Sequence, residues 1–187
     1  MKLKLLYGLA AVNVLLACQS NSYQIDGYAQ AFQEGDTICL ATSDQVERPF
    51  SQTVVSGGKF AFAGEAGDFT LCRAYVKQQP DCGTEFFLEP GRIAIELYPR
   101  PKMSRVSGTV YNNEWQHLSD SIQLLSKDII YILRHPATDA ERQQRDVHTI
   151  DSLHRRMSDC IVHTAQRNKD NPLGRYILEN YKKPEFK

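Results

Sequence analysis

The spacing of apolar residues changes near Gly108, and this change limits the folds that the chain can adopt. Before it, apolar and polar side chains alternate, as at Phe60 and Phe62 or at Ile93 and Ile95, which is the period of a half-buried strand. After it, apolar residues recur at alternating intervals of three and four, which is the period of one helix face. The sequence therefore predicts an all-β unit followed by helices.

Eight short segments of the first part have strand character and are separated by turn residues. Gly57-Gly58 favours a tight hairpin, because glycine readily takes the positive φ of two-residue turns, and Pro90-Gly91 marks a second turn. Short strands at this regular spacing are typical of an antiparallel β-sandwich or a partly open barrel. The expected strands cover residues 23–30, 36–42, 50–56, 59–63, 69–76, 84–88, 92–98 and 104–107.

A C-terminal α-helical hairpin and a short helix are expected after the strands, so the fold class is mainly β with a helical end. Asn112-Asn113 opens the first helix and His135-Pro136 closes it. Its apolar stripe should pack on the sheet or on the next helix, and consists of Trp115, Leu118, Ile122, Leu125, Ile129 and Ile132.

The second helix should begin at Thr138, which has the capping-box spacing to Glu141. Its inward residues are expected to be Val147, Ile150, Met157 and Ile161. Asn171-Pro172 predicts a last short helix, with asparagine as the cap and proline at the first helical position.

The N-terminal segment has the pattern of a secretory signal peptide. Lys2 and Lys4 give it a positive start, and residues 5–17 are mainly apolar but too short for a membrane span of about 20 residues. It ends at Leu15-Leu16-Ala17-Cys18, which resembles the lipobox of bacterial lipoproteins. The resemblance implies removal of residues 1–17 and attachment of diacylglycerol to the Cys18 thiol. An ordinary signal peptide or a buried N-terminal helix is the alternative.

Export would place the other cysteines, Cys39, Cys72, Cys82 and Cys160, in an oxidising compartment. Four cysteines allow three complete pairings, and the sequence does not choose among them. Cys72 and Cys82 flank the turn-like residues 77–81, which favours a local disulfide worth roughly 2.5–3 kcal/mol in the chain-entropy model. The sequence has no C-x-x-C pair.

Four segments combine turn residues with aromatic ones in a fixed order: residues 54–64 (VVSGGKFAFAG), 85–91 (EFFLEPG), 107–112 (SGTVYN) and 171–176 (NPLGRY). In this order, behind a lipobox, they resemble domain of unknown function 4369. That family comprises N-terminal accessory domains of Bacteroidetes lipoproteins and thiol-disulfide oxidoreductases. A thioredoxin-like module with a C-x-x-C site commonly follows the domain. The resemblance here implies the accessory domain without that module.

The expected organisation is a lipid-anchored tether over residues 18–22, a β-sandwich over 23–110 and a helical segment packed on it over 111–187. In lipoproteins of this type, an acidic run after the cysteine tends to mark export to the cell surface. Residues 19–22 include no acidic residue. We therefore expect attachment to the cell envelope at the outer membrane, on its periplasmic side.

Lysine plus arginine and aspartate plus glutamate both number 22, so the chain has no formal net charge. This balance gives no reason to expect a nucleic-acid partner or long-range attraction to an acidic membrane surface. His154-Arg155-Arg156 forms one basic cluster on the second helix. A solvated helix face explains it better than a phosphate site does.

No residues of the sequence form a recognisable catalytic or metal centre. Cys160 and His163 share a helix face, but the spacings of structural zinc sites are absent. Glu85 and Glu89 would share a strand face without a visible cleft, and no G-x-S-x-G motif occurs. A redox cysteine needs a thiol pKa below the usual value. Arg73, which follows Cys72, is a weak indication of such a lowered pKa. We expect no enzyme activity, cofactor or bound metal.

Phe86 and Phe87 are neighbours on one expected strand and so cannot both face the same core. One of them should lie under the helices, or else line a groove or a partner surface. The functional hypothesis is a lipid-anchored envelope protein with a non-catalytic binding or docking β-sandwich, whose partner is an envelope protein or a small ligand. The alternative is an accessory component of periplasmic thiol-disulfide exchange that works with a separate thioredoxin-like protein.

Overall fold

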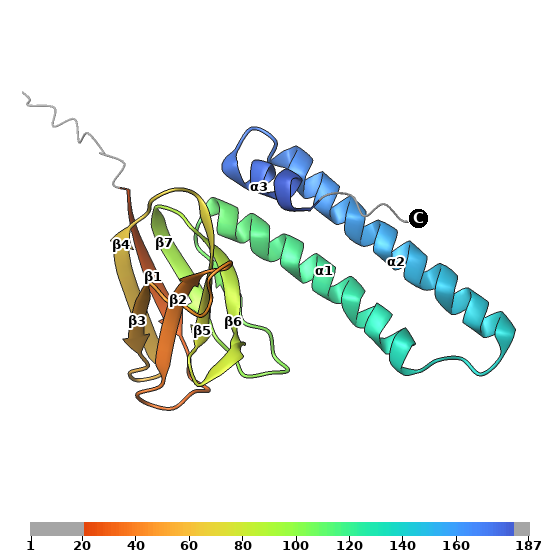
Figure 1. Cartoon of the computed structure of the whole chain (residues 1–187), viewed down its shortest axis with the longest axis horizontal. Coiled ribbons are helices and arrows are strands. Elements are labelled where there is room, and N and C mark those ends of the chain that lie inside the picture. Colours follow the sequence, from red (N-terminus) through yellow and green to blue (C-terminus); the bar gives the residue numbers. More distant parts are fainter. Residues whose placement is uncertain (1–20, 182–187) are drawn as a thin grey trace, which may run out of the picture.

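A computed structural model describes residues 21–181, which form two four-stranded sheets followed by three helices (Figure 1). The first sheet has the order β4-β1-β7-β8 and the second has the order β3-β2-β5-β6. All eight expected strands are present, with β6 starting earlier than expected. Their bounds are β1 Ser22–Tyr28, β2 Thr37–Thr42, β3 Ser51–Val54, β4 Lys59–Glu65, β5 Thr70–Val76, β6 Gln79–Leu88, β7 Gly91–Glu96 and β8 Arg105–Ser107.

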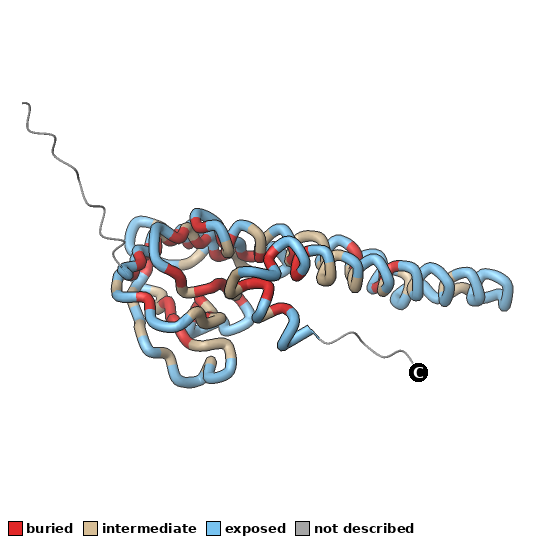
Figure 2. The backbone as a smooth tube through the Cα atoms, turned by 90° about the horizontal axis from the view of Figure 1, so that it is seen from above, coloured by how far each residue is buried: buried red, intermediate tan, exposed pale blue. Residues whose placement is uncertain are grey.

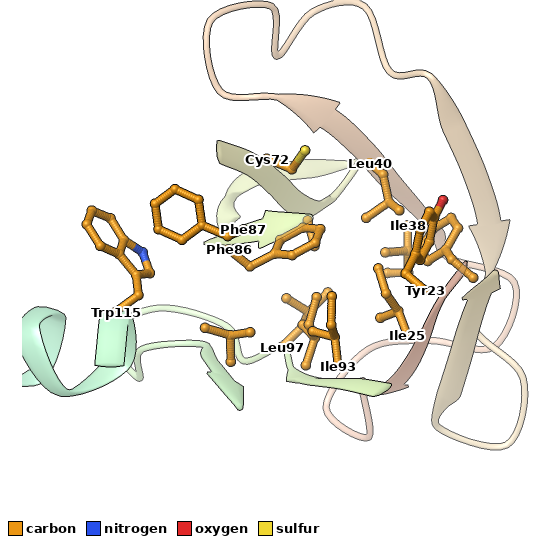
Figure 3. Close-up of a cluster of buried hydrophobic side chains, with 14 of the residues drawn as sticks. Tyr23, Ile25, Ile38, Leu40, Cys72, Phe86, Phe87, Ile93, Leu97 and Trp115 are labelled. Atoms are coloured by element: carbon orange, nitrogen blue, oxygen red, sulfur yellow. The ribbon is translucent and has the colours of Figure 1, made fainter. Parts of the chain in front are cut away.

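The two sheets form an open sandwich rather than a closed barrel, so the first of the two expected architectures is correct. Neighbouring strands are antiparallel except for β1 and β7, which run parallel with Ile25 opposite Ile93. Alternate side chains of both sheets meet in the core, as periodicity two requires. Figure 3 shows the aliphatic and aromatic residues that fill this space, among them Ile25, Ile38, Leu40, Phe86 and Ile93, all of them fully buried.

The Gly57-Gly58 turn forms as predicted but has a different role. Both glycines have positive φ, 58° and 71°, and Ser56 pairs with Lys59 across the turn. The strands on either side then separate, because β3 belongs to one sheet and β4 to the other. The turn is therefore a corner that joins the two layers, and not the end of a two-stranded hairpin.

The helices are α1 Val110–Arg134, α2 Ala140–Arg167 and α3 Pro172–Asn180. The expected start of α1 after Asn112-Asn113 is wrong, since its N-cap is Thr109. The capping box at Thr138 is also wrong, because Asp139 is the cap of α2 and its carboxylate accepts from the Arg142 N–H at 2.9 Å. The cap of α3 is confirmed: Asn171 accepts from the Gly174 N–H.

The first two helices form a long antiparallel hairpin, the arm, of which only the near end touches the sandwich. At 1.5 Å per residue, α1 and α2 are about 37 and 42 Å long. Trp115 and Leu118 join the sandwich core, whereas Leu125 and Ile129 pack against Leu153 of α2 in a separate cluster. The arm leads away from the end of the molecule at which β1 begins (Figure 1). None of helices α1 to α3 is long and apolar enough to cross a membrane.

Candidate functional site

The predicted lipidation residue Cys18 and the leader, residues 1–17, lie outside the described residues. The described chain starts at Asn21, whose side-chain amide donates to the Ala66 carbonyl at 2.7 Å. Ser22 already pairs with Glu65 as the first residue of β1. Of the expected tether, Ser22 is therefore already the first residue of the inner strand β1, and Asn21 is hydrogen-bonded just before it.

The structure contradicts the local disulfide between Cys72 and Cys82, both of which are buried free thiols. Cys72 on β5 lies opposite Phe86 of β6, four residues along the strand from Cys82. Four strand residues span about 13 Å, whereas a disulfide needs Cα atoms within roughly 7 Å. Because residues 79–84 continue strand β6, the segment between the cysteines does not fold them back on each other.

Among the thiols of the described chain, that of Cys72 has an environment that disfavours the thiolate form. Cys39, Cys72 and Cys82 are buried, and Cys160 is partly exposed. Burial raises the pKa of the Cys72 thiol to about 12, with a smaller contribution from the Asp44 carboxylate. Since the thiolate is the reactive form, Cys72 is suited to packing and not to exchange.

Asn112 is the polar centre of the joint between sandwich and arm, and it is fully buried. Its side-chain oxygen accepts from the Phe87 N–H at 2.8 Å, and its amide donates to the Phe87 carbonyl at 2.9 Å. Because β6 is an edge strand, these Phe87 groups have no neighbouring strand to pair with. Asn112 thus takes the place of a neighbouring strand and ties the first turn of α1 to the sheet.

Glu89 completes this joint from the link between β6 and β7. Its buried carboxylate accepts from the Thr109 hydroxyl at 2.6 Å, from the Asn112 backbone N–H at 3.1 Å and from the Asn112 amide at 3.1 Å. Burial raises the pKa of Glu89, and the hydrogen bond from Thr109 opposes the shift. The carboxylate is thus a cap of the first turn of α1, supplied from the link between β6 and β7.

Aromatic rings surround the same joint. Phe87 stacks on Phe69 with ring centroids 4.4 Å apart, and meets Trp115 and Tyr176 edge to face at 5.3 and 5.1 Å. Phe86 points the other way, into the space between the sheets (Figure 3). The expectation that one of the two phenylalanines lies under the helices is therefore confirmed, and it is Phe87 that fixes both α1 and α3 to the sandwich.

The far end of the arm, the tip, exposes an unusual amount of apolar surface. Residues 129–133 are Ile-Ile-Tyr-Ile-Leu, a run of five apolar residues at the end of α1. Ile130, Tyr131 and Leu133 are 47%, 65% and 64% exposed. Val147 of α2, which was expected to point inward, is 57% exposed, so that expectation is wrong. Figure 2 shows that burial decreases along the arm, and its tip is almost wholly exposed.

A shallow groove of about 420 Å³ lies between α1 and α2 nearer the sandwich. It is lined by Arg156 of the basic cluster, by the candidate pair Cys160 and His163, and by His117 of α1. Cys160 and His163 therefore share a face as predicted. No three metal-binding side chains among residues 21–181 are placed to hold an ion. Nearby, Arg167 pairs with Glu114 at 3.1 Å.

A comparison with protein families matches residues 23–115 to the family described as Domain of unknown function (DUF4369). The match includes the sandwich and the whole joint, namely Phe87, Glu89, Thr109 and Asn112. It ends at Trp115, so most of the arm and the fourth segment of the resemblance, residues 171–176, lie outside it. No curated protein matches the chain.

Proposed function

We propose that this chain is a lipid-anchored docking protein of the cell envelope. Its residues 23–115 form a DUF4369 domain, and the description of that family names no function. In this proposal the sandwich carries no catalysis. It serves as a rigid base, and the α1–α2 arm presents its tip to a protein partner.

One observation carries the docking proposal: a stretch of five apolar residues at the tip of a helical hairpin with three of its side chains in water. A helix that is apolar on all sides is normally buried, and contiguous exposed apolar surface marks interaction sites. Leu125 and Ile129 fill the contact with Leu153, and neither Ile130 nor Leu133 belongs to this buried cluster of the described hairpin. A surface of this kind is expected to be covered in the cell.

The position of the arm supports anchoring at the opposite end. The described chain starts at the edge of the sandwich away from the tip, as both views show (Figures 1 and 2). A lipid on Cys18 would therefore hold the base at the membrane and leave the tip free to reach a partner. The thiol-exchange alternative loses support, because the described cysteines are buried except for Cys160 and no observation favours a reactive thiol.

The lipid anchor is tested by Cys18→Ser. The variant is expected to move from the membrane fraction to the soluble periplasmic fraction, or to remain uncleaved, because stable anchoring takes at least two acyl chains. Immunoblots of separated fractions measure the change, with Cys160→Ser as the matched control that keeps the anchor. A Cys18→Ser protein that is cleaved and still sediments with membranes would show that the anchor is wrong.

Docking through the tip is tested in cells with the full chain. A photoreactive benzoylphenylalanine in place of Ile130 should give a cross-linked product on illumination, because an occupied tip lies within contact of its partner. The control places the same residue at Arg155, which is exposed on α2. Equal or absent products at the two positions on denaturing gels would remove the support for docking.

A further inference from the structure

The groove between α1 and α2 brings together basic side chains from both helices. Its volume of about 420 Å³ lies within the usual range of small-molecule sites, which is roughly 300–1,000 Å³. His117 lines it from α1, and Arg156 and His163 line it from α2. Leu118 and Thr164 also line the groove and are both buried, so they form its floor. The groove is therefore large enough to hold a small anion or organic compound.

The periodicity of α2 places its basic residues in one row along this groove. Arg156, His163 and Arg167 follow one another at intervals of seven and four residues. At 100° per residue they lie within about 40° of one another around the helix, and the row extends about 16 Å along the helix axis. The residues that line the groove do not include Arg155. The structure thus divides the basic cluster that the sequence presented as one solvated face.

The described chain neutralises these basic residues only in part. Arg167 pairs with Glu114 at 3.1 Å, at the end of the groove nearer the sandwich. Arg156 and His163, in contrast, have no hydrogen-bond or ion-pair partner among residues 21–181. Two arginines of the tip both have carboxylate partners within the hairpin. The far end of the groove therefore offers N–H donors without an acceptor.

One acidic residue, Asp159, also lines the groove, but it lies at the outer edge. Asp159 is rotated by about 60° from Arg156 around α2, whereas the buried Thr164 is rotated by about 80° in the opposite sense. Within the described residues Asp159 forms no ion pair with Arg156 or His163. Its carboxylate therefore lies at the mouth of the groove and leaves the donors nearer the floor unneutralised.

We propose that this groove binds a phosphate group, held by Arg156 from one end and by His117 and His163 from the two sides. Arginine and histidine N–H groups form strong hydrogen bonds to phosphate oxygens. Here the donors come from two helices and from different directions. Such an arrangement suits a tetrahedral phosphate better than a carboxylate, whose two oxygens lie in one plane. The inference goes beyond the docking function, because the groove and the tip share no residue.

Isothermal titration calorimetry of the full chain, purified in a neutral detergent, tests the site with inorganic phosphate. A dissociation constant of about 1 mM or below is expected. Arg156→Gln should weaken binding at least about tenfold, because it removes charge-assisted hydrogen bonds, and His163→Gln at least about threefold. Arg155→Gln removes the same charge from the neighbouring position and should change the affinity by about twofold or less. The three side chains are exposed, so the variants should fold normally.

Three outcomes would overturn the proposal. The first is the absence of binding at phosphate concentrations up to about 10 mM. The second is an equal loss of affinity in Arg156→Gln and Arg155→Gln, which would show a general effect of positive charge. The third is acetate that binds as tightly as phosphate, since a phosphate site must distinguish the two anions.

Two further probes distinguish the sources of the phosphate group. Glycerol 3-phosphate represents a soluble phosphate ester, and dihexanoyl phosphatidic acid carries the same group on two short acyl chains. If the acyl chains improve binding at least about tenfold and Arg156→Gln removes this gain, the ligand is a lipid headgroup. Equal affinities for the two probes assign a soluble phosphate ester. Either result supports the phosphate group as the ligand of the groove.

Discussion

Replacing Asn112 with alanine is expected to lower the free energy of unfolding by about 3–4 kcal/mol. The substitution removes the partner of the Phe87 N–H and carbonyl and one donor to the Glu89 carboxylate, all of them buried. Each buried polar group left without a partner costs roughly 1–3 kcal/mol, which makes this loss large for a single polar residue. Urea unfolding of the variant and the parent protein, followed by circular dichroism, measures the difference.

Asn113 is the matched control for this change. It is the next residue on α1, it is exposed, and its side-chain oxygen accepts one hydrogen bond within the described residues, from the Gly108 N–H at 3.0 Å. Asn113→Ala should cost about 1 kcal/mol or less. Equal effects of the two substitutions would show that the buried network at Asn112 does not hold the arm to the sandwich.

Phe87→Ala is expected to destabilise the protein by about 3–5 kcal/mol, which is usual for removal of a fully buried aromatic ring. The ring contacts Phe69 of the sandwich, Trp115 of α1 and Tyr176 of α3, so a cavity there loosens all three parts together. Thermal unfolding measures the loss. Phe50→Ala, at a ring that is half exposed, should change the stability by about 0.5 kcal/mol or less. If Phe87→Ala lowered the stability only slightly, the aromatic contacts at Phe87 would not be what links the helices to the sandwich.

The strands were predictable because alternation is a local signal, and the segments around Phe60, Phe62, Ile93 and Ile95 carry it clearly. How the strands pair was not predictable in the same way. Gly57 and Gly58 determine that the chain turns there, but not whether β3 and β4 remain together after the turn. The parallel pairing of β1 with β7 joins segments far apart in the sequence, and no local pattern reports it.

The joint was missed because its residues have local explanations that compete with the tertiary one. Asn112 looks like a residue that opens a helix, and Glu89 looks like the end of a strand followed by a Pro-Gly turn. Their actual partners are Phe87 and Thr109, which only the fold brings close. The segments quoted for the family resemblance contain all four residues. The joint therefore explains these four positions of the segments 85–91 and 107–112.

Local patterns also account for the incorrect disulfide prediction and for the missed exposure of the tip. A turn between Cys72 and Cys82 suggested proximity, but strand β6 continues through residues 79–84 and carries Cys82 away. At the tip the sequence did contain the signal. Within the apolar run 129–133, only Ile129 and Ile132 fit the apolar stripe of α1. The other three residues, Ile130, Tyr131 and Leu133, are more than one helix face can bury.

Docking through the tip requires an arm that folds as one unit with its base, and unfolding followed by two probes tests this directly. Trp115 is the only tryptophan of the chain and lies at the joint, so its fluorescence reports the contact between arm and sandwich. Circular dichroism at 222 nm reports the helices, most of whose residues lie beyond the joint. Coincident urea transitions are predicted, with one midpoint for both signals. Loss of the helical signal at a clearly lower urea concentration than the change at Trp115 would show an arm that unfolds by itself, and would contradict a rigid docking arm.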